Sequence, residues 1–277
     1  MKTVFIATDF SPASRNASLY GVHLATFLGA RIVLFYASEY FPPPPGESPY
    51  DSIEEAKSII ESKLLNEVMA IRITEFQPVD ILTEMGIPKD IILECASRYQ
   101  ETIIVCGMKG EGKKIKRLMG TTAVHLARNS KIPVMIIPEE ADYVPVRSIV
   151  LANDFSVLTD IHTIDLIQAI GERYQSKVYI VRVMPNHTNE VSELSFRSER
   201  FVQKLHHLHP EYKFLRSKRI TECLENFIRD YNIDLLAVIP HRHNILERLF
   251  SASMTKKFIF HTHIPLLVLP EIKIHLQ

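Results

Sequence analysis

The sequence of 277 residues lacks an excess of either charge, because 32 lysines and arginines balance 32 aspartates and glutamates. A neutral chain has no global electrostatic attraction for nucleic acid or for an anionic membrane. Long apolar segments are also missing, and the chain runs from Met1 and Lys2 directly into "TVFIATDFS", without a cleavage site of small residues. We therefore expect a cytoplasmic protein with neither a nucleic-acid nor a membrane partner.

Cysteine is scarce as well. Cys95, Cys106 and Cys223 lie far apart, within apolar patterns and without a CxxC pair. This arrangement predicts buried thiols in a reducing compartment rather than a disulfide framework. Apolar residues make up 46% of the chain, which is enough for one large core or two ordinary ones.

An internal repeat is the main organising feature. Four strand-like apolar segments of the first half have counterparts in the second half, in the same order and at comparable separations. The pairs are "TVFIATDFS" (3–11) with "SIVLANDFS" (148–156), "RIVLFYA" with "KVYIVRV", "ETIIVCG" with "IDLLAVI", and "IPVMIIPEE" with "IPLLVLPEI". These matches indicate a tandem duplication of a unit of roughly 140 residues, which is the usual size of a domain. We predict two domains, residues 1–142 and 143–277, that join near "EEADYVPVR".

Each half alternates short Val/Ile/Leu-rich runs with helical stretches, which is typical of a parallel sheet covered on both faces. The first helix should begin at Pro12 with Ser11 as its N-cap and end at Gly29. A second helix is predicted over residues 52–68 and a third from Pro88. In the first helix, Leu19, Val22 and Leu24 are expected to face the sheet. The second helix is predicted from apolar residues that share one face, namely Ile53, Ala56, Ile60, Leu64 and Val68.

The order of these elements predicts a doubly wound, five-stranded parallel sheet in each domain. In such a sheet the ligand lies beyond the carboxyl ends of the strands, where the winding reverses between the first and fourth strands. Asp9 ends the first predicted strand and Gly107 ends the fourth. These two residues should therefore meet at the same crevice.

The stretch "GMKGEGKK" after the fourth strand is nearly a P-loop, but Lys114 stands where a Ser or Thr should ligate magnesium. A different spacing fits better: Gly107, two residues, Gly110, nine residues, Gly120, then Thr121. It predicts a phosphate-binding site in two parts, with glycines at the end of the strand and Gly120 at the start of the next helix. The free N–H groups and the dipole at that helix start favour an anion.

These motifs resemble the universal stress protein family, whose nucleotide-binding members carry G-x2-G-x9-G-[ST] after the fourth strand and an Asp at the end of the first. "GMKGEGKKIKRLMGTT" fits every fixed position, and "GIPKDII" (86–92) is similar to the family's G-x-P stretch. The resemblance covers essentially the whole chain as two copies. It implies a Rossmann-like fold of the adenine-nucleotide α-hydrolase type and a nucleotide-binding role in regulation or stress response.

The resemblance also implies a ligand and its binding residues. ATP, or AMP or ADP, with or without Mg²⁺, should lie in the first domain, with Asp9 at the adenosine and the backbone of Ala37 at the base. The lysines and Arg117 between Gly107 and Gly120 can attract a polyphosphate, or can form a solvated charged loop. The implied ligand-binding residues are Ala7, Thr8, Asp9, Ala37, Gly107, Met108, Gly110, Gly120, Thr121 and Thr122.

The second half departs from this pattern. After "IDLLAVI" it reads "PHRHNILERLFSASMTKK", with no glycine where the first half has four. Asp154 and Val183 stand at the counterparts of Asp9 and Ala37, but side chains should fill the space that phosphates need. An adenosine-like pocket could persist without phosphate recognition, but we expect this half not to bind ATP in the mode of the family. Its expected role is to pair with the first half through the strands "VMIIP" and "LLVLP". The pairing follows that of family dimers and leaves room for a further homodimer.

Histidines gather in the second half, as "HHLH" (206–209), "HRH" (241–243) and "HTH" (261–263). The last two flank opposite ends of the predicted sheet, which argues against a joint zinc site, and we predict titrating surface histidines instead. No catalytic group or metal-binding set is evident. The leading interpretation is a regulatory nucleotide-binding protein in which slow ATP hydrolysis stays open. An adenylylating enzyme is disfavoured by the first loop, "TDFSPAS", and a scaffold without nucleotide binding is the remaining alternative.

Overall fold

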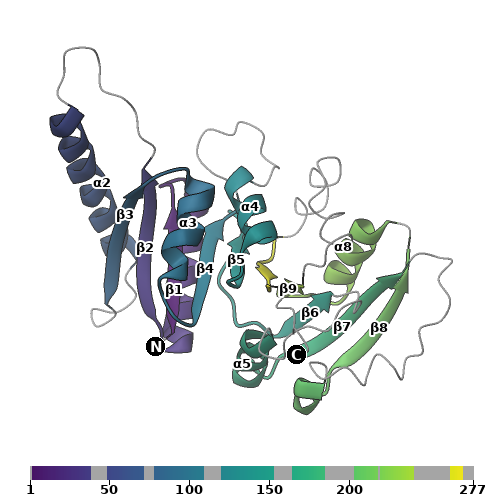
Figure 1. The fold of residues 1–277 in the computed structure, drawn as a ribbon. Helices are drawn as coiled ribbons and strands as arrows, with labels where there is room; N and C mark the ends of the chain where they lie inside the picture. The colour runs from purple at the N-terminus through teal and green to yellow at the C-terminus, as the bar shows by residue number, and fades with distance from the viewer. Residues whose placement is uncertain are drawn as a thin grey trace, which may run out of the picture. The chain divides into compact units, whose positions relative to one another are not determined.

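The computed structural model describes residues 2–38, 49–71, 78–108, 120–152, 164–184, 203–217, 219–239 and 263–270. They fall into two compact units, the first ending at Tyr143 and the second beginning at Val144. In both units short parallel strands alternate with helices (Figure 1). This architecture confirms the predicted fold class.

The first unit is built on a parallel sheet with the strand order β3-β2-β1-β4-β5. Thr3 at the start of β1 pairs with Arg31 of β2 on one side and with Thr102 of β4 on the other. The carboxyl ends of these three strands therefore align at one edge of the sheet. The strands are β1 (Thr3–Thr8), β2 (Arg31–Ser38), β3 (Val79–Met85), β4 (Thr102–Gly107) and β5 (Val134–Ile137).

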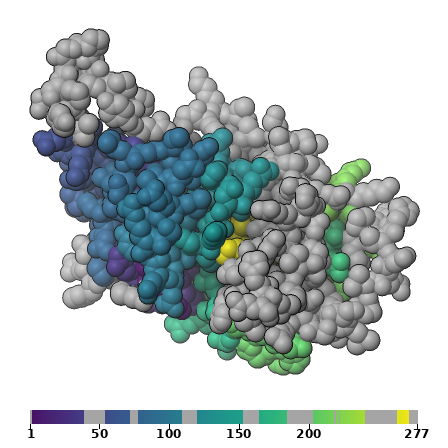
Figure 2. Space-filling model, viewed as in Figure 1, coloured from purple at the N-terminus to yellow at the C-terminus, as the bar shows by residue number. Residues whose placement is uncertain are grey.

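Four helices in the described part of the first unit cover this sheet. Helix α1 packs on β1 and β4 and contacts α2, whereas α3 packs against α4. Figure 2 shows the side chains of α3 and α4 side by side over one face of the first unit. The helices are α1 (Pro12–Leu28), α2 (Pro49–Ile71), α3 (Pro88–Ser97) and α4 (Thr121–Asn129).

Helix α1 has the boundaries that its sequence predicts. Ser11 Oγ accepts a hydrogen bond from the Ser14 N–H at 3.2 Å, and Gly29 takes the left-handed conformation at φ 60°. The expectation for Leu19 is wrong, because its side chain is 42% exposed, although Val22 and Leu24 are buried. Several of the buried residues of α1 are small, and they include Ala17, Ser18, Gly21 and Ala25. At Gly21 the absent side chain lets the helix approach Ile6 of β1 closely.

Helix α2 is longer than predicted, and its apolar face is only partly buried. Leu64 is fully buried, but Ala56 is exposed and Ile60 is half-buried. Strand β3 was not located in the sequence, since "VDILTEM" mixes polar and apolar residues at the edge of the sheet. The third helix begins at Pro88 as expected.

The second unit has the strand order β10-β9-β6-β7-β8, again all parallel. When the strands are numbered in chain order within each unit, both sheets have the order 3-2-1-4-5. The pattern located four of its strands and missed β8, a half-exposed edge strand. The elements are β6 (Ser148–Ala152), α5 (Asp165–Tyr174), β7 (Lys177–Met184), η2 (His206–Leu208), β8 (Glu211–Arg216), α8 (Ile220–Asp230), β9 (Leu235–Val238) and β10 (Leu266–Val268).

Within the described parts of the chain, none of the helices is both long and apolar enough to span a membrane.

The segment that follows β5 is held against α1 by hydrogen bonds and a ring contact. Asn16 Nδ2 donates hydrogen bonds to the Pro138 and Ala141 carbonyl oxygens at 2.9 and 2.8 Å. Tyr143 stacks on His23 of α1, with 4.3 Å between ring centroids.

Replacing Asn16 by Ala should lower the free energy of unfolding by about 1–3 kcal/mol, because two partly buried carbonyl groups lose their donor. Urea unfolding measures the change. Asn129→Ala is the matched control, since the exposed Asn129 side chain bonds only to the His125 carbonyl of its own helix and its loss should cost under ~0.5 kcal/mol. Equal destabilisation by the two variants would contradict the anchoring role of Asn16.

Candidate functional site

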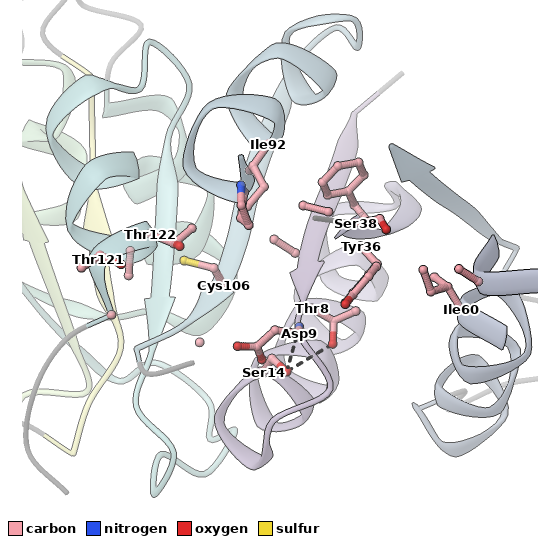
Figure 3. Close-up of a pocket in the computed structure, with 18 of the residues that line it drawn as sticks. Thr8, Asp9, Ser14, Tyr36, Ser38, Ile60, Ile92, Cys106, Thr121 and Thr122 are labelled. Atoms are coloured by element: carbon pink, nitrogen blue, oxygen red, sulfur yellow. Dashed lines mark hydrogen bonds between the residues drawn. The ribbon is translucent and has the colours of Figure 1, made fainter. Parts of the chain in front are cut away.

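A cleft of about 650 Å³ opens at the carboxyl ends of β1, β2 and β4 in the first unit (Figure 3). It lies where the winding of the sheet reverses, as the sequence predicts. Eight residues expected at the ligand line it, while Met108 is buried next to Gly107 and Gly110 lies outside the described residues. The eight are Ala7, Thr8, Asp9, Ala37, Gly107, Gly120, Thr121 and Thr122.

The turn after β1 holds Asp9 at the cleft through local hydrogen bonds. The Asp9 N–H donates to Ser14 Oγ at 3.3 Å, and Asp9 Oδ1 accepts from the Ser11 N–H at 3.1 Å. Phe10 takes the left-handed conformation at φ 62°, and its N–H donates to Thr8 Oγ1 at 3.1 Å. The turn therefore presents a carboxylate, an acceptor for sugar hydroxyls, at a fixed position.

A buried carboxylate behind this turn is not visible in the sequence pattern. Glu67 of α2 is 6% exposed and accepts hydrogen bonds from Thr8 Oγ1 at 3.2 Å and from Ser18 Oγ at 2.7 Å. These bonds join α2 to the end of β1 and to α1. A buried carboxylate needs such donors, so the three elements are held in one arrangement.

Gly107 is required by packing at the end of β4. A Cβ added there would lie 2.8 Å from the backbone carbonyl atoms of Ala13 and 2.9 Å from the Ser14 nitrogen. The absent side chain therefore lets β4 approach the start of α1. The sequence analysis assigned this glycine to the phosphate site and did not identify its packing role.

Gly120 immediately precedes α4 and is hydrogen-bonded to Met108, the residue that follows β4. Its N–H donates to the Met108 carbonyl at 2.6 Å, and the Met108 N–H donates to the Ile137 carbonyl at 2.8 Å. Gly120 precedes the first turn of α4 at φ −60° and ψ 146°, and Thr121 and Thr122 follow it into the cleft. The first N–H groups of a helix have no intrahelical acceptor, which suits an anion.

The side of the cleft opposite α4 is apolar and is formed by α2. Of its lining residues, the sequence analysis identified only Ala56 and Ile60, as part of the apolar face of the second helix. In Figure 3, Ile60 of α2 and Thr122 of α4 lie on opposite sides, with Thr8, Asp9 and Tyr36 between them. Helix α2 also contributes Ala56 and Ile59 to this side, whereas Pro88 and Ile92 come from α3, which packs against α4. The cleft is therefore polar at α4 and apolar at α2 and α3.

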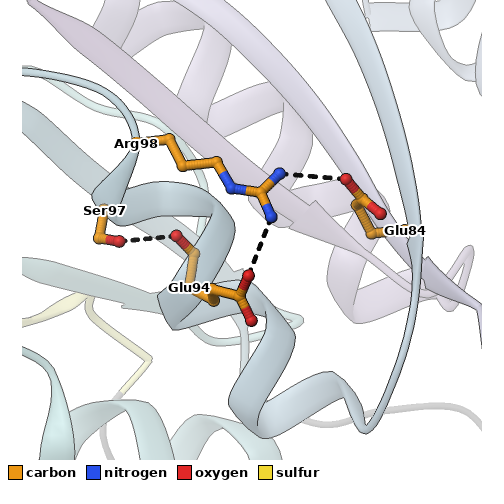
Figure 4. Close-up of polar contacts among 4 residues, drawn as sticks. All are labelled: Glu84, Glu94, Ser97 and Arg98. Atoms are coloured by element: carbon orange, nitrogen blue, oxygen red, sulfur yellow. Dashed lines mark hydrogen bonds and ion pairs between the residues drawn. The ribbon is translucent and has the colours of Figure 1, made fainter.

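An exposed ion pair links the end of α3 to the edge strand β3. Arg98 at the end of α3 donates to Glu84 of β3 at 3.0 Å and to Glu94 of its own helix at 2.9 Å (Figure 4). Pairs this exposed contribute little to stability. The pair with Glu84 nevertheless connects the helix that carries Pro88 and Ile92 to β3.

Cys106 lines the base of the cleft. Burial and, to a lesser degree, the nearby Asp9 charge raise the pKa of its thiol to about 12. Cys95 is buried as well, whereas Cys223 is half-buried. A thiol that stays protonated is a poor nucleophile and metal ligand, so Cys106 acts here as an apolar lining residue.

Several sequence expectations concern the second unit or the loops. Val183 is buried in β7, while Asp154 and the residues at 240–262 lie outside the described parts of the chain, as do the lysines between Gly107 and Gly120. Of the described histidines, His207 contacts Glu172 at 2.8 Å. The described residues contain no group of three side chains suited to hold a metal ion.

Comparison with known proteins supports the relationship that the motifs suggest. The sequence profile of the Universal stress protein family matches residues 1–138. A universal stress protein of Mycobacterium tuberculosis is 26% identical over 228 residues, covering 77% of this chain and 76% of the relative. One from Methanocaldococcus jannaschii is 27% identical over 140 residues, covering 49% of this chain and 81% of the relative. A crystal structure of a universal stress protein from Archaeoglobus fulgidus shares the fold, with a TM-score of 0.73 and 14% identity, over 97% of this chain and 98% of that one.

Gly107→Ala should destabilise the protein by about 1–3 kcal/mol, because a backbone contact cannot yield to the new methyl group. Thermal or urea unfolding tests this. Gly171→Ala is the control: its Cβ would meet the tip of the Leu208 side chain at 2.6 Å, which can move, and alanine favours the helix. If Gly107→Ala proves as mild as Gly171→Ala, close packing of β4 on α1 is not the reason for this glycine.

Cys106 should resist alkylation in the folded protein at about pH 8.5, because only the thiolate reacts. In the unfolded chain the thiol regains its ordinary pKa of 9.0 and should react readily. The unfolded thiol also ionises first as pH rises, so stability should fall between about pH 9 and 12. Mass spectrometry after iodoacetamide treatment, with and without urea, measures the difference. Rapid labelling of Cys106 in the folded protein would show that the thiol is accessible and ionised.

Proposed function

The chain belongs to the universal stress protein family, and from this premise we propose that its first unit binds an adenine nucleotide, ATP, ADP or AMP, in the cleft described above. Binding serves regulation, in that the occupied and empty forms differ in conformation or in the choice of a protein partner. The observation that carries the proposal is the meeting of Asp9 with the glycine-opened start of α4 in one cleft. Two motifs that are more than a hundred residues apart in the sequence thereby serve one ligand.

The polar side of the cleft matches the parts of a nucleotide. Phosphate oxygens accept from the N–H groups at the start of α4 and from the Thr121 and Thr122 hydroxyls. The Asp9 carboxylate accepts from ribose hydroxyls, and the end of β2 at Ala37 offers backbone groups to the base. Each role rests on the chemistry of the group and on its presence at the cleft.

A magnesium ion fits this site only together with the phosphates. Asp9 is the single carboxylate among the described residues that line the cleft, and Mg²⁺ commonly binds one or two carboxylates plus phosphate oxygens. Bound in this way, the ion would neutralise phosphate charge. The described lining offers no second group that would act as a base on water, so we assign binding rather than catalysis to the site.

The Gly120→Val variant tests the phosphate end of the site. Its backbone angles allow a side chain, so the fold should persist while the isopropyl group obstructs phosphate approach. Calorimetric titration of ATP with Mg²⁺ into protein stripped of nucleotide should show binding to the wild type and at least ~100-fold weaker binding to Gly120→Val.

A urea unfolding curve for the variant keeps this result interpretable, because it separates loss of the fold from loss of the site. AMP should lose less affinity than ATP, since it presents fewer phosphate groups to α4. Unchanged ATP affinity in folded Gly120→Val would refute the proposed site. Absence of binding by any adenine nucleotide to the wild type would favour a scaffold instead.

A further inference from the structure

Helix α2 carries a carboxylate in the middle of its buried stripe. Leu64 and Ile71 are buried and lie one turn to either side of Glu67, so the three side chains share one face of the helix. The removal of a carboxylate from water is costly unless donors replace the water, and an apolar side chain would fill the same place without that cost. Packing alone therefore does not account for Glu67.

The contacts of Glu67 lead from α2 to the turn that holds Asp9. Thr8 Oγ1 donates to Glu67 Oε2 at 3.2 Å, and the same hydroxyl oxygen accepts from the Phe10 N–H at 3.1 Å. A carboxylate only accepts hydrogen bonds, so it takes the single hydroxyl hydrogen of Thr8 and leaves the oxygen lone pairs to the turn. Glu67 thereby fixes the direction in which the Thr8 hydroxyl points.

The turn after β1 needs this support. Phe10 adopts the left-handed conformation at φ 62°, which residues other than glycine rarely take unless the surrounding structure holds them there. Without the carboxylate of α2, the Thr8 hydroxyl would turn to Ser14 Oγ, which lies 3.2 Å away and already accepts the Asp9 N–H at 3.3 Å (Figure 3). Competition at Ser14 Oγ would loosen the Asp9 backbone and, with it, the carboxylate at the cleft.

We propose that Glu67 is a positioning residue for ribose recognition: acting through Thr8, it holds the Asp9 carboxylate where the ribose hydroxyls can donate to it. The inference rests on the proposed function, because it takes the nucleotide and the place of its ribose from there. The described residues of α2 that line the cleft are apolar, so this helix controls ribose selectivity from behind the turn. A loosened Asp9 should weaken the binding of a nucleotide with ribose hydroxyls and leave that of one without them unchanged.

The test compares ATP with 2′,3′-dideoxy-ATP, which lacks both ribose hydroxyls. Calorimetric titration of each with Mg²⁺ into protein stripped of nucleotide gives two Kd values. Their ratio measures ribose selectivity, because partial unfolding of a variant weakens both nucleotides alike. The wild type should favour ATP at least ~10-fold, the ratio expected for hydrogen bonds to a charged group. In Glu67→Met the preference should fall to about twofold or less, because methionine is similar in length but only a weak acceptor.

Two further variants separate positioning from stability. In Glu67→Gln the side-chain carbonyl still accepts from Thr8 and the amide can donate to Ser18 Oγ, so the preference should stay within about threefold of the wild type. Leu64→Ala changes a buried residue one turn earlier on the same face, which has no hydrogen-bonding group and does not line the cleft. It should keep the preference although the cavity destabilises the fold, and urea unfolding measures that destabilisation in each variant.

The outcomes separate this inference from the proposed function. If ATP binds and Glu67→Met keeps the wild-type preference, the positioning role is refuted while the nucleotide site stands. An equal loss of preference in Leu64→Ala or in Glu67→Gln would also refute it, because the acceptor at this position would then not be the cause. If the wild type binds both nucleotides equally, Asp9 does not recognise the ribose and the inference fails. If neither nucleotide binds, the proposed function and the inference fall together.

Discussion

The first unit depends on one constraint, the parallel pairing of β1 with β2 on one side and with β4 on the other. Since the chain leaves β1 toward β2 and returns to β4 through later crossovers, the helices diverge at the carboxyl end of β1. That divergence creates the cleft. It also explains why Asp9, which ends β1, and Gly120, which precedes α4, line the same cavity although they lie far apart in the sequence.

Packing behind the cleft fixes the groups that face it. Gly107 lets β4 approach the backbone at the start of α1, and Glu67 ties α2 to Thr8 and Ser18 through hydroxyl hydrogen bonds. Neither contact needs a ligand, so the described part of the cleft is formed in advance, which reduces the entropic cost of binding. The open part is the side of the cleft at α2, where Ile59 is exposed.

The sequence predicts what local chemistry and periodicity determine, namely the buried strands, the Ser11 cap, the Gly29 end of α1 and the position of the crevice. It does not locate β3 and β8, because half-exposed edge strands carry mixed patterns. Leu19 was assigned to the sheet face, since the pattern favours large apolar residues over the small ones that pack there. Glu67 could not be found because its partners Thr8 and Ser18 are 59 and 49 residues away along the chain.

The most direct test of the account is an NMR titration that follows backbone amide signals with adenosine and then with ATP. Adenosine should shift the amides of Asp9 and Ala37, and ATP should in addition shift those of Gly120, Thr121 and Thr122. This difference would place the phosphates at the start of α4 and the nucleoside at β1 and β2. Shifts confined to the second unit, or identical shifts with both ligands, would contradict the assignment of the split glycine motif to phosphate binding.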